Sequence, residues 1–158
     1  MYPKKYVPKN LSKKDKSKQK KMLKRSKRLY KRGQYYEREK VKSFKSKKSP
    51  HVKKAEKIYK INSVKASKEL SDKTGCSVAG LKQIVKKGQG AYYSSGSRPN
   101  QTAHSWGRAR LASAVTGGKS SQIDYHILEK YCKKNSKALR LANNSKFKNK
   151  IKRTPKTN

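Results

Sequence analysis

The chain has 158 residues, of which 46 are lysine or arginine and 8 are aspartate or glutamate, giving a formal charge of +38. Only 31% of the residues are hydrophobic. This excludes a core along the whole length, because ordering each residue costs about 1–2 kcal/mol that apolar burial has to offset. There is no run of about 18 apolar residues, so we expect no membrane span, and MYPKKYVPKN lacks the apolar stretch of a secretory signal.

Charge divides the chain into three zones. Their local charges are +21 over residues 1–60, +7 over 61–130 and +10 over 131–158. Most glycines and the single tryptophan lie in the middle zone, where a core can form. We predict a basic N-terminal arm, ordered by a partner, over residues 1–60. A compact helical core follows over 61–132, and a basic tail over 133–158.

The arm contains signals for two helices. Ser12 and Asp15 fit a variant of the capping box, and an acid in the first turn suits the helix dipole, which predicts a helix that ends near Gly33. The apolar residues of this helix are too few for a stable stripe, so it needs a surface to lie on. These residues are Met22, Leu23, Leu29 and Tyr30.

Residues 34–48 indicate an extended linker, anchored by Tyr35, Tyr36 and Phe44. Ser49-Pro50 then has the N-cap and first-turn proline of a short helix. Val52, Ala55, Ile58 and Tyr59 form the apolar edge of that helix.

Four helices are predicted in the core. They are 65–74, ended by Gly75; about 78–87, capped by Ser77 and ended by Gly88; 103–115, capped by Thr102 and stopped by Gly117-Gly118; and 124 to about 132. SKALRLANN predicts one or two further helical turns before a polar, basic coil. No segment shows the alternation of a half-buried strand, and Ala91-Tyr92-Tyr93 is the only stretch where a strand remains an alternative. The predicted fold class is therefore all-α.

The stretch Ser67 to Lys86 has the layout of a helix-turn-helix, with Gly75 at the turn and Leu81 and Ile84 holding the second helix. An ordinary helical hairpin uses the same turn chemistry and is the preferred interpretation. In the DNA-binding alternative, the groove-facing residues are Ser77, Ala79, Lys82, Gln83 and Lys86, and their contacts are mainly to phosphates.

The loop from Ser94 to Thr102 is the most distinctive stretch, because Gly96 and Pro99 fix its path around Arg98. With the free N–H groups of the next helix, Arg98 could hold a phosphate or a carboxylate. The equal alternative is a structural loop in which Arg98 bonds backbone carbonyls or Asp124.

Trp106 lies among small residues that allow close helix packing, so we interpret it as a keystone of the core rather than as a base-stacking residue. Arg108 and Arg110 are two positions apart on the same predicted helix. They therefore point to different sides, and at least one is outward or paired internally.

Catalytic and metal-binding patterns are missing. His51, His104 and His126 are far apart, no phosphate-binding glycine loop is present, and Asp124-Tyr125-His126 is typical of a helix start. Cys76 and Cys132 give neither a disulfide framework nor a metal clasp, so we predict two reduced thiols. We expect a non-enzyme without cofactor, metal or small-molecule substrate.

Positive charge is therefore the predicted working surface, since each phosphate that is neutralised releases a counterion. Gly75, Gly96, Pro99, Trp106 and Asp124 are the candidate structural keystones. The candidate polyanion or partner contacts are Lys24, Arg25, Lys27, Arg28, Lys31, Arg32, Lys82, Lys86, Arg98, Arg108 and Arg110.

Three segments carry a resemblance: YVPKNLSKKDKSKQ, KRSKRLYKRGQYYEREKVKSFKSKKSPHVKKAEKIY, and SKELSDKTGCSVAGLKQIVKKGQGAYYSSGSRPNQTAHSWGRARLASAVTGGKSSQIDYHIL. Over about residues 6–132 the chain resembles a family of small lysine-rich proteins of large nucleocytoplasmic DNA viruses, the phycodnaviruses and mimivirus relatives. The resemblance implies an all-α core with a basic N-terminal arm, and it brings no assigned catalytic or binding residues.

The virus context favours a minor capsid protein on the inner side of an icosahedral shell, with basic arms along neighbouring major and minor capsid proteins or the genome. Such a protein is made in the host cytoplasm or nucleus and resides in the virion. The alternative is a virion or nuclear protein that condenses double-stranded DNA by phosphate neutralisation. A ribosomal-type RNA binder shares the composition but not the resembling segment.

Overall fold

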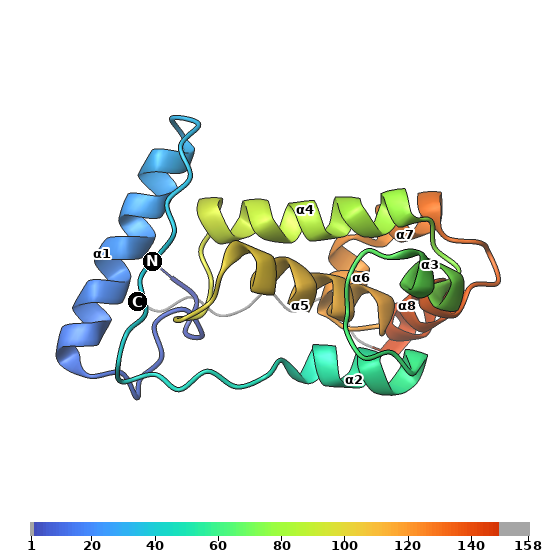
Figure 1. Cartoon of the computed structure of the whole chain (residues 1–158), viewed down its shortest axis with the longest axis horizontal. Helices are drawn as coiled ribbons and strands as arrows, with labels where there is room; N and C mark the ends of the chain where they lie inside the picture. The colour runs from blue at the N-terminus through green and yellow to red at the C-terminus, as the bar shows by residue number, and fades with distance from the viewer. Residues whose placement is uncertain (1, 149–158) are drawn as a thin grey trace. The chain divides into compact units, whose positions relative to one another are not determined.

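The computed structural model describes residues 2–148, with side chains described through residue 145. Within this range the protein is all-α, as predicted, with eight helices and no β-strand (Figure 1). The helices are α1 (Lys13–Tyr30), α2 (Pro50–Tyr59), α3 (Lys68–Thr74), α4 (Val78–Ser94), α5 (Ala103–Val115), α6 (Lys119–Ile123), α7 (Tyr125–Tyr131) and α8 (Lys137–Lys148).

The described residues form two compact units. Unit 1 comprises residues 2–47 and 89–106, and unit 2 comprises residues 48–88 and 107–148. Helices α4 and α5 contribute residues to both. This division differs from the expected boundaries near residues 60 and 132, because the N-terminal residues pack on a later segment of the same chain.

Helix α1 begins where the capping signal predicts, since the Ser12 hydroxyl accepts a hydrogen bond from the Asp15 N–H at 3.1 Å. The buried face of α1 contains two polar residues in addition to the apolar residues expected from the sequence. Gln19, Met22, Leu23 and Ser26 are buried, at the spacing of one helix face. Both polar groups are satisfied, because Gln19 donates to the Tyr6 carbonyl and Ser26 to the Tyr93 carbonyl.

Two small apolar clusters hold unit 1 together. One consists of Tyr6, Val7 and Leu23, with Tyr2 and Trp106 packed against it. The other consists of Leu11, Met22 and Val41, with Tyr36 and Phe44 against it. Tyr36 and Phe44 are therefore anchors of residues 34–48, as predicted, whereas Tyr35 is mostly exposed.

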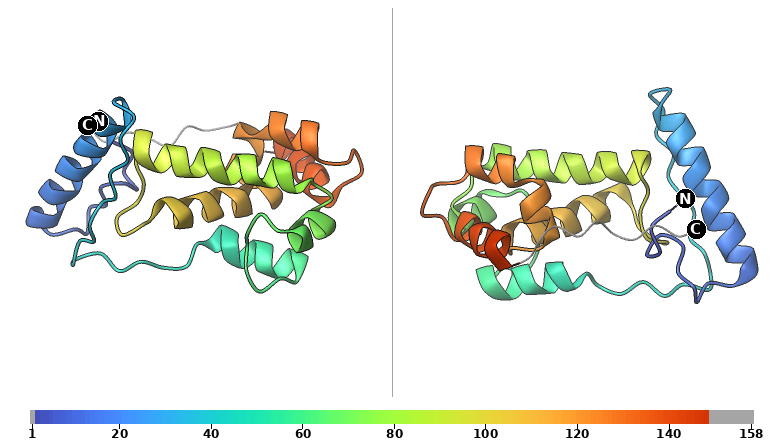
Figure 2. Two further views of the ribbon diagram at one scale, coloured as in Figure 1. Left: turned by 45° about the horizontal axis from the view of Figure 1, so that its top comes forward. Right: turned by 180° about the vertical axis from the view of Figure 1, so that it is seen from behind.

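Helix α4 continues past Gly88 to Ser94, so the predicted end at Gly88 is wrong, and Ala91-Tyr92-Tyr93 is helical. Gly88 serves packing instead: a Cβ built there would lie 2.7 Å from the Gly107 Cα. α4 and α5 run side by side in all views (Figure 2). The predicted close approach at the small residues of α5 is therefore confirmed.

Residues 111–116 of unit 2 are all buried, so the C-terminal part of α5 is surrounded by protein rather than lying on a surface. Helix α2 begins at Pro50, and α3 is ended by Gly75 in the left-handed conformation, both as predicted. The start of α3 is Lys68 rather than the predicted residue 65. The helix predicted over 124–132 is α7, and α6 precedes it. The tail forms α8, and the rest of the predicted coil lies outside the described residues.

Cys76 and Cys132 form a disulfide, which corrects the prediction of two reduced thiols. They lie opposite one another in an isolated antiparallel bridge. The Ser77 N–H donates to the Tyr131 carbonyl at 2.8 Å, and the Lys133 N–H donates to the Gly75 carbonyl at 3.0 Å. Tertiary folding thus brings the beginning of α4 to the end of α7, which a sequence separation of 56 could not reveal.

Candidate nucleic-acid interface

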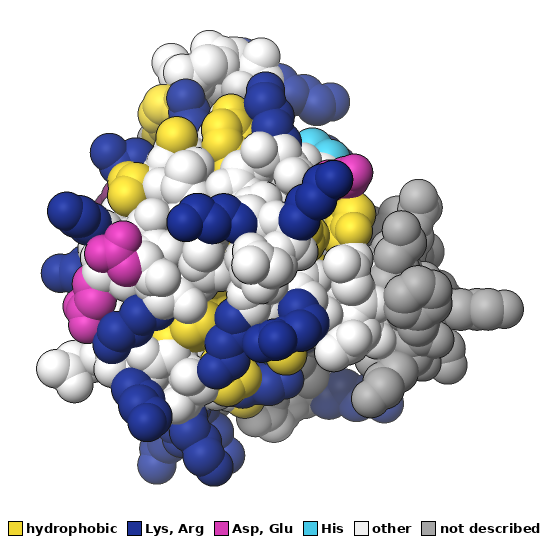
Figure 3. All heavy atoms as spheres, turned by 90° about the vertical axis from the view of Figure 1, so that its right-hand side faces the viewer, with side chains coloured by type: hydrophobic (Ala, Val, Ile, Leu, Met, Phe, Trp, Pro, Cys, Tyr) yellow, Lys and Arg dark blue, Asp and Glu magenta, His cyan; other side chains and the backbone are white. Residues whose placement is uncertain are grey.

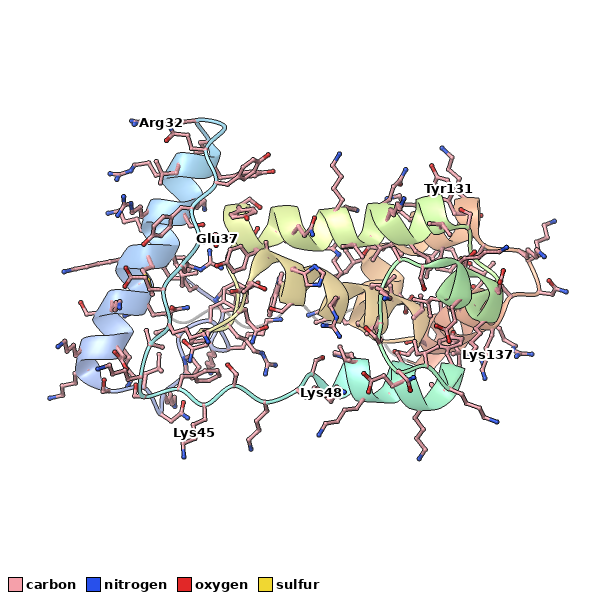
Figure 4. All side chains as sticks on the ribbon, viewed as in Figure 1. Arg32, Glu37, Lys45, Lys48, Tyr131 and Lys137 are labelled. Carbon is pink, nitrogen blue, oxygen red and sulfur yellow. A yellow bond between two sulfur atoms is a disulfide. The ribbon has the colours of Figure 1, made fainter. Side chains whose placement is uncertain are left out.

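The face of α1 opposite its buried residues is cationic and exposed. Helical spacing separates it from the buried face of Gln19, Met22, Leu23 and Ser26. The exposed cations of α1 are Lys13, Lys14, Lys20, Lys21, Lys24, Arg25, Lys27 and Arg28, and the exposed Lys31 and Arg32 follow the helix. All six N-terminal candidates from the sequence therefore lie on the surface; Figure 4 shows Arg32 pointing away from the ribbon. We call these ten residues the basic face.

The charge on α1 is large for its length. Ten lysines and arginines and one acid, Asp15, give the helix a net charge of 10 − 1 = +9. Its 18 residues span about 27 Å at 1.5 Å each. A DNA duplex of that length carries on the order of 16 phosphates, so the helix matches about half of the duplex charge.

The first turn of α1 is fixed to the following segment by Asp15 and Ser43. The Asp15 carboxylate accepts hydrogen bonds from the Ser43 N–H at 2.8 Å and the Ser43 hydroxyl at 2.6 Å. These bonds favour the charged carboxylate and lower the pKa of Asp15, with Lys18 adding to the effect. The same serine accepts from the Ser12 N–H, so three residues close the beginning of the helix.

Two cations of α1 contact residues 34–40. The Lys18 ammonium pairs with Glu39 at 2.7 Å, and this pairing raises the pKa of Lys18. The Arg25 guanidinium lies 4.7 Å from the Tyr36 ring centre, a cation–π distance. Because both pairs are at the surface, each contributes little stability by itself.

Arg38 is a structural residue that sequence analysis missed. Its guanidinium stacks 3.8 Å from the Tyr92 ring centre and donates to the Ser26 hydroxyl, the Tyr92 carbonyl and the Ser97 hydroxyl at 2.8–2.9 Å. Burial lowers the pKa of Arg38. The extended segment is thus fixed to α1, α4 and the loop after α4. Glu-Arg-Glu in a basic linker gave no signal of this role.

The loop before α5 is built as structure and presents Arg98 outward. Asn100, with φ of +61°, accepts from the Val41 N–H at 2.7 Å and donates to the Val41 and Phe44 carbonyls. Gly96 has φ of +102°, and a Cβ there would lie 2.7 Å from Leu23. Pro99 is buried, whereas Arg98 is exposed and makes no side-chain hydrogen bond to a described residue.

Asp124 pairs with Arg110 and not with Arg98, the partner considered from the sequence. This carboxylate is 0% exposed and accepts two hydrogen bonds from Arg110, each at 2.8 Å, while the Lys87 ammonium lies 3.1 Å away. Arg110 is therefore neutralised inside unit 2 and leaves the set of polyanion contacts. Arg108 is half-buried, and its Nε donates to the Val64 carbonyl at 3.2 Å.

Trp106 is half-buried in unit 1, not in the core of unit 2. Its ring packs edge-on against Tyr6 at 5.9 Å, and the Lys5 ammonium lies 5.7 Å from its centre. It therefore holds the N-terminal segment in unit 1.

The remaining candidates from the sequence are in unit 2. Lys82 and Lys86 are exposed on α4. Gly75 has φ of +78°, and a Cβ there would lie 2.6 Å from the Ser136 Cβ.

Cations are scattered over the face that Figure 3 shows, and acidic side chains on it are few. In the part of the chain that the structure describes, no three His, Cys, Asp or Glu side chains come together as a metal site. None of the described helices combines the length and apolar character that crossing a membrane requires.

Residues 3–140 match a family of unknown function, DUF5824. The chain belongs to that family. No curated protein and no solved structure matches it. Residues 3–140 include α1, the Arg98 loop and the Asp124 site, so the family match covers most of both units and ends within α8.

Proposed function

We propose that this protein is a non-catalytic structural protein that binds double-stranded DNA through the basic face. The observation that carries the proposal is the gathering of exposed cations opposite the buried face of α1. Because packing fixes the helix, the backbone that carries these cations is ordered before binding, which lowers the ordering cost of the complex. Their contacts would be to phosphates, which gives affinity without sequence specificity.

The test compares two variants with the same loss of charge. Lys20, Lys24, Lys27 and Arg28 are replaced by Gln in the first variant, and Lys53, Lys54, Lys57 and Lys65 of unit 2 in its control. All eight side chains are exposed, and none forms a described salt bridge. Duplex DNA binding is measured by anisotropy across a range of salt concentrations.

We expect the plot of log Kobs against log salt concentration to become less steep by about 3–4 units in the first variant, because each lost phosphate contact reduces the magnitude of the slope by about 0.9. The control should lose less than about half of that. Equal losses in the two variants would reject the basic face as the binding surface. If the DNA affinity of the wild-type protein does not change with salt concentration, binding through phosphates is rejected altogether.

Further cations are proposed as secondary contacts. Lys82 and Lys86 lie on the exposed side of α4, after the Gly75 turn, where a helix-turn-helix would place its groove-facing residues. Arg98 is the third, since it is exposed on a fixed loop. Lys82→Gln should weaken binding about equally for all duplex sequences, because phosphate contacts carry no sequence information.

A minor capsid protein on the inner side of an icosahedral shell is the second proposed function. The resemblance of residues 6–132 to proteins of large DNA viruses supports it. So does the extended segment 34–49, from which the exposed Lys45 projects (Figure 4). Such a segment suits contact with acidic surfaces of major and minor capsid proteins.

These functions differ in where the protein remains after disruption of a virion. A capsid protein should stay with salt-washed, DNA-depleted shells at a fixed copy number related to the shell symmetry. Release of all of it with the genome would exclude the capsid function and would agree with DNA binding.

A further inference from the structure

Three tyrosines form an aromatic cluster at one end of unit 1. Tyr30 is in the last turn of α1, Tyr35 follows the turn after it, and Tyr93 is in the last turn of α4. The Tyr30 and Tyr35 ring centres are 6.2 Å apart, and those of Tyr35 and Tyr93 are 4.9 Å apart. We call these three residues the tyrosine platform.

The platform is exposed, which a purely structural role does not require. Tyr35 is 71% exposed and Tyr30 is 37% exposed. The described residues expose only one other large hydrophobic side chain, Ile123 in unit 2. Tyr93 is half-buried, and burial raises the pKa of its phenol, with Glu37 adding to the rise.

The platform rests on a fixed base. Tyr93 packs edge-on against the buried Tyr92 at 5.0 Å, and Arg38 covers the Tyr92 ring. Ser26, one helix turn before Tyr30, donates to the Tyr93 carbonyl. Because Arg38 fixes the segment that carries Tyr35, the rings are positioned before any ligand arrives.

Cations flank the platform residues in the chain. Lys27 lies one turn before Tyr30 on the same side of α1. Lys31 and Arg32 stand between Tyr30 and Tyr35 in the chain, and all three cations are exposed. Glu37 is the acidic group nearest in sequence; it is exposed and lies close enough to act on Tyr93. Three cations against one carboxylate give the segment around Tyr30 and Tyr35 a net positive charge.

We propose that the tyrosine platform binds an unpaired nucleobase of single-stranded nucleic acid, whose phosphates contact Lys27, Lys31 and Arg32. Aromatic side chains stack on any base whose face is open, and flanking cations neutralise the backbone. In a duplex both faces of each base are covered by its neighbours, so the platform discriminates single strands from duplexes. The inference rests on the proposed nucleic-acid function and adds a second ligand class to it.

The experiment measures binding of two probes, a poly(dT) strand of about 12 nucleotides and a duplex of equal length. Tyr35→Leu removes the ring but keeps an apolar side chain, and Tyr35→Phe restores the ring without the hydroxyl. Since Tyr35 is mostly exposed, neither change disturbs a buried contact; melting curves of the full chain check this.

Tyr35→Leu should weaken poly(dT) binding by about 10-fold, as expected for the loss of one stacked base. The affinity for duplex should stay within about 2-fold of wild type, and its salt dependence should be unchanged, because the phosphate contacts remain. Tyr35→Phe should bind poly(dT) as wild type does. Unchanged poly(dT) binding by Tyr35→Leu, or an equal loss for both probes, overturns the proposal.

Failure of the basic face and failure of the platform give different results. If the quadruple α1 variant binds duplex normally, the proposed function fails while the Tyr35 comparison still decides the platform. The Tyr35→Leu variant could instead bind both probes normally but no longer remain associated with purified capsid shells. In that case the platform contacts a protein rather than a nucleobase, and the inference is overturned.

Discussion

Asp124 and Arg38 show that part of the charge of this protein is internal. Asp124 is fully buried and is held by Arg110 and Lys87. Arg38 is held by two hydroxyls, a carbonyl and an aromatic ring. A buried charge is tolerated only when its partners satisfy it, so these residues cannot be exchanged singly.

Asp124→Ala should lower the free energy of unfolding by about 3–5 kcal/mol, because it leaves the half-buried Arg110 and the Lys87 ammonium without their carboxylate. Urea denaturation of the purified chain measures the change. Glu129→Ala is the control: this acid is nearby in sequence but exposed, and we expect a change within about 0.5 kcal/mol. Similar values for the two variants would contradict the structural role of Asp124.

Helices α4 and α5 cross at a pair of glycines, Gly88 and Gly107. A glycine inside a helix costs about 1 kcal/mol relative to alanine, so its presence there needs a packing reason. Gly88 has one, since any side chain would meet the backbone of α5. Gly90, two positions later, has only the Tyr30 hydroxyl within 4 Å, at 3.7 Å, an ordinary van der Waals contact.

The two glycines should therefore respond to alanine with opposite signs. Gly88→Ala should destabilise the protein by about 1 kcal/mol or more, because the strain of forcing α4 and α5 apart exceeds the gain in helix propensity. Gly90→Ala should stabilise it by about 0.5–1 kcal/mol. Thermal and urea unfolding of both variants test this; a stabilising Gly88→Ala would show that the helices can separate without cost.

Over the whole molecule, little apolar surface holds together a chain of charge +38. Unit 1 relies on two small apolar clusters and on Arg38, whereas unit 2 has the larger core and the Cys76–Cys132 disulfide. A crosslink stabilises by restricting the unfolded chain, and more so for a longer loop.

Reduction of the disulfide should lower the stability of unit 2 by on the order of 4 kcal/mol, given a sequence separation of 56. Urea unfolding with and without a reductant measures the loss. A double variant with Cys76→Ser and Cys132→Ser should match the reduced wild type and should be insensitive to reductant. An identical midpoint for oxidised and reduced wild type would contradict the prediction.

Local signals in the sequence predicted much of the helical structure. Ser12, Ser49, Ser77 and Thr102 precede helices α1, α2, α4 and α5, and Pro50 begins α2, because caps and prolines act within one helical turn. The same local reasoning failed at Gly88, where a packing glycine and a terminating glycine look alike in one sequence. It also placed the six N-terminal candidate cations on a helix and its following turn, where all are exposed.

By itself, the sequence determined the helical class, most helix boundaries and the excess of cations, since these depend on neighbours within a few residues or on composition. Only the tertiary structure decided which charges remain outside. It paired Arg110 with Asp124, stacked Arg38 on the buried Tyr92 ring, and joined Cys76 to Cys132. It also packed residues 2–47 against residues 89–106 to form one compact unit. These contacts join residues far apart in the chain, and no local pattern encodes which distant segments meet.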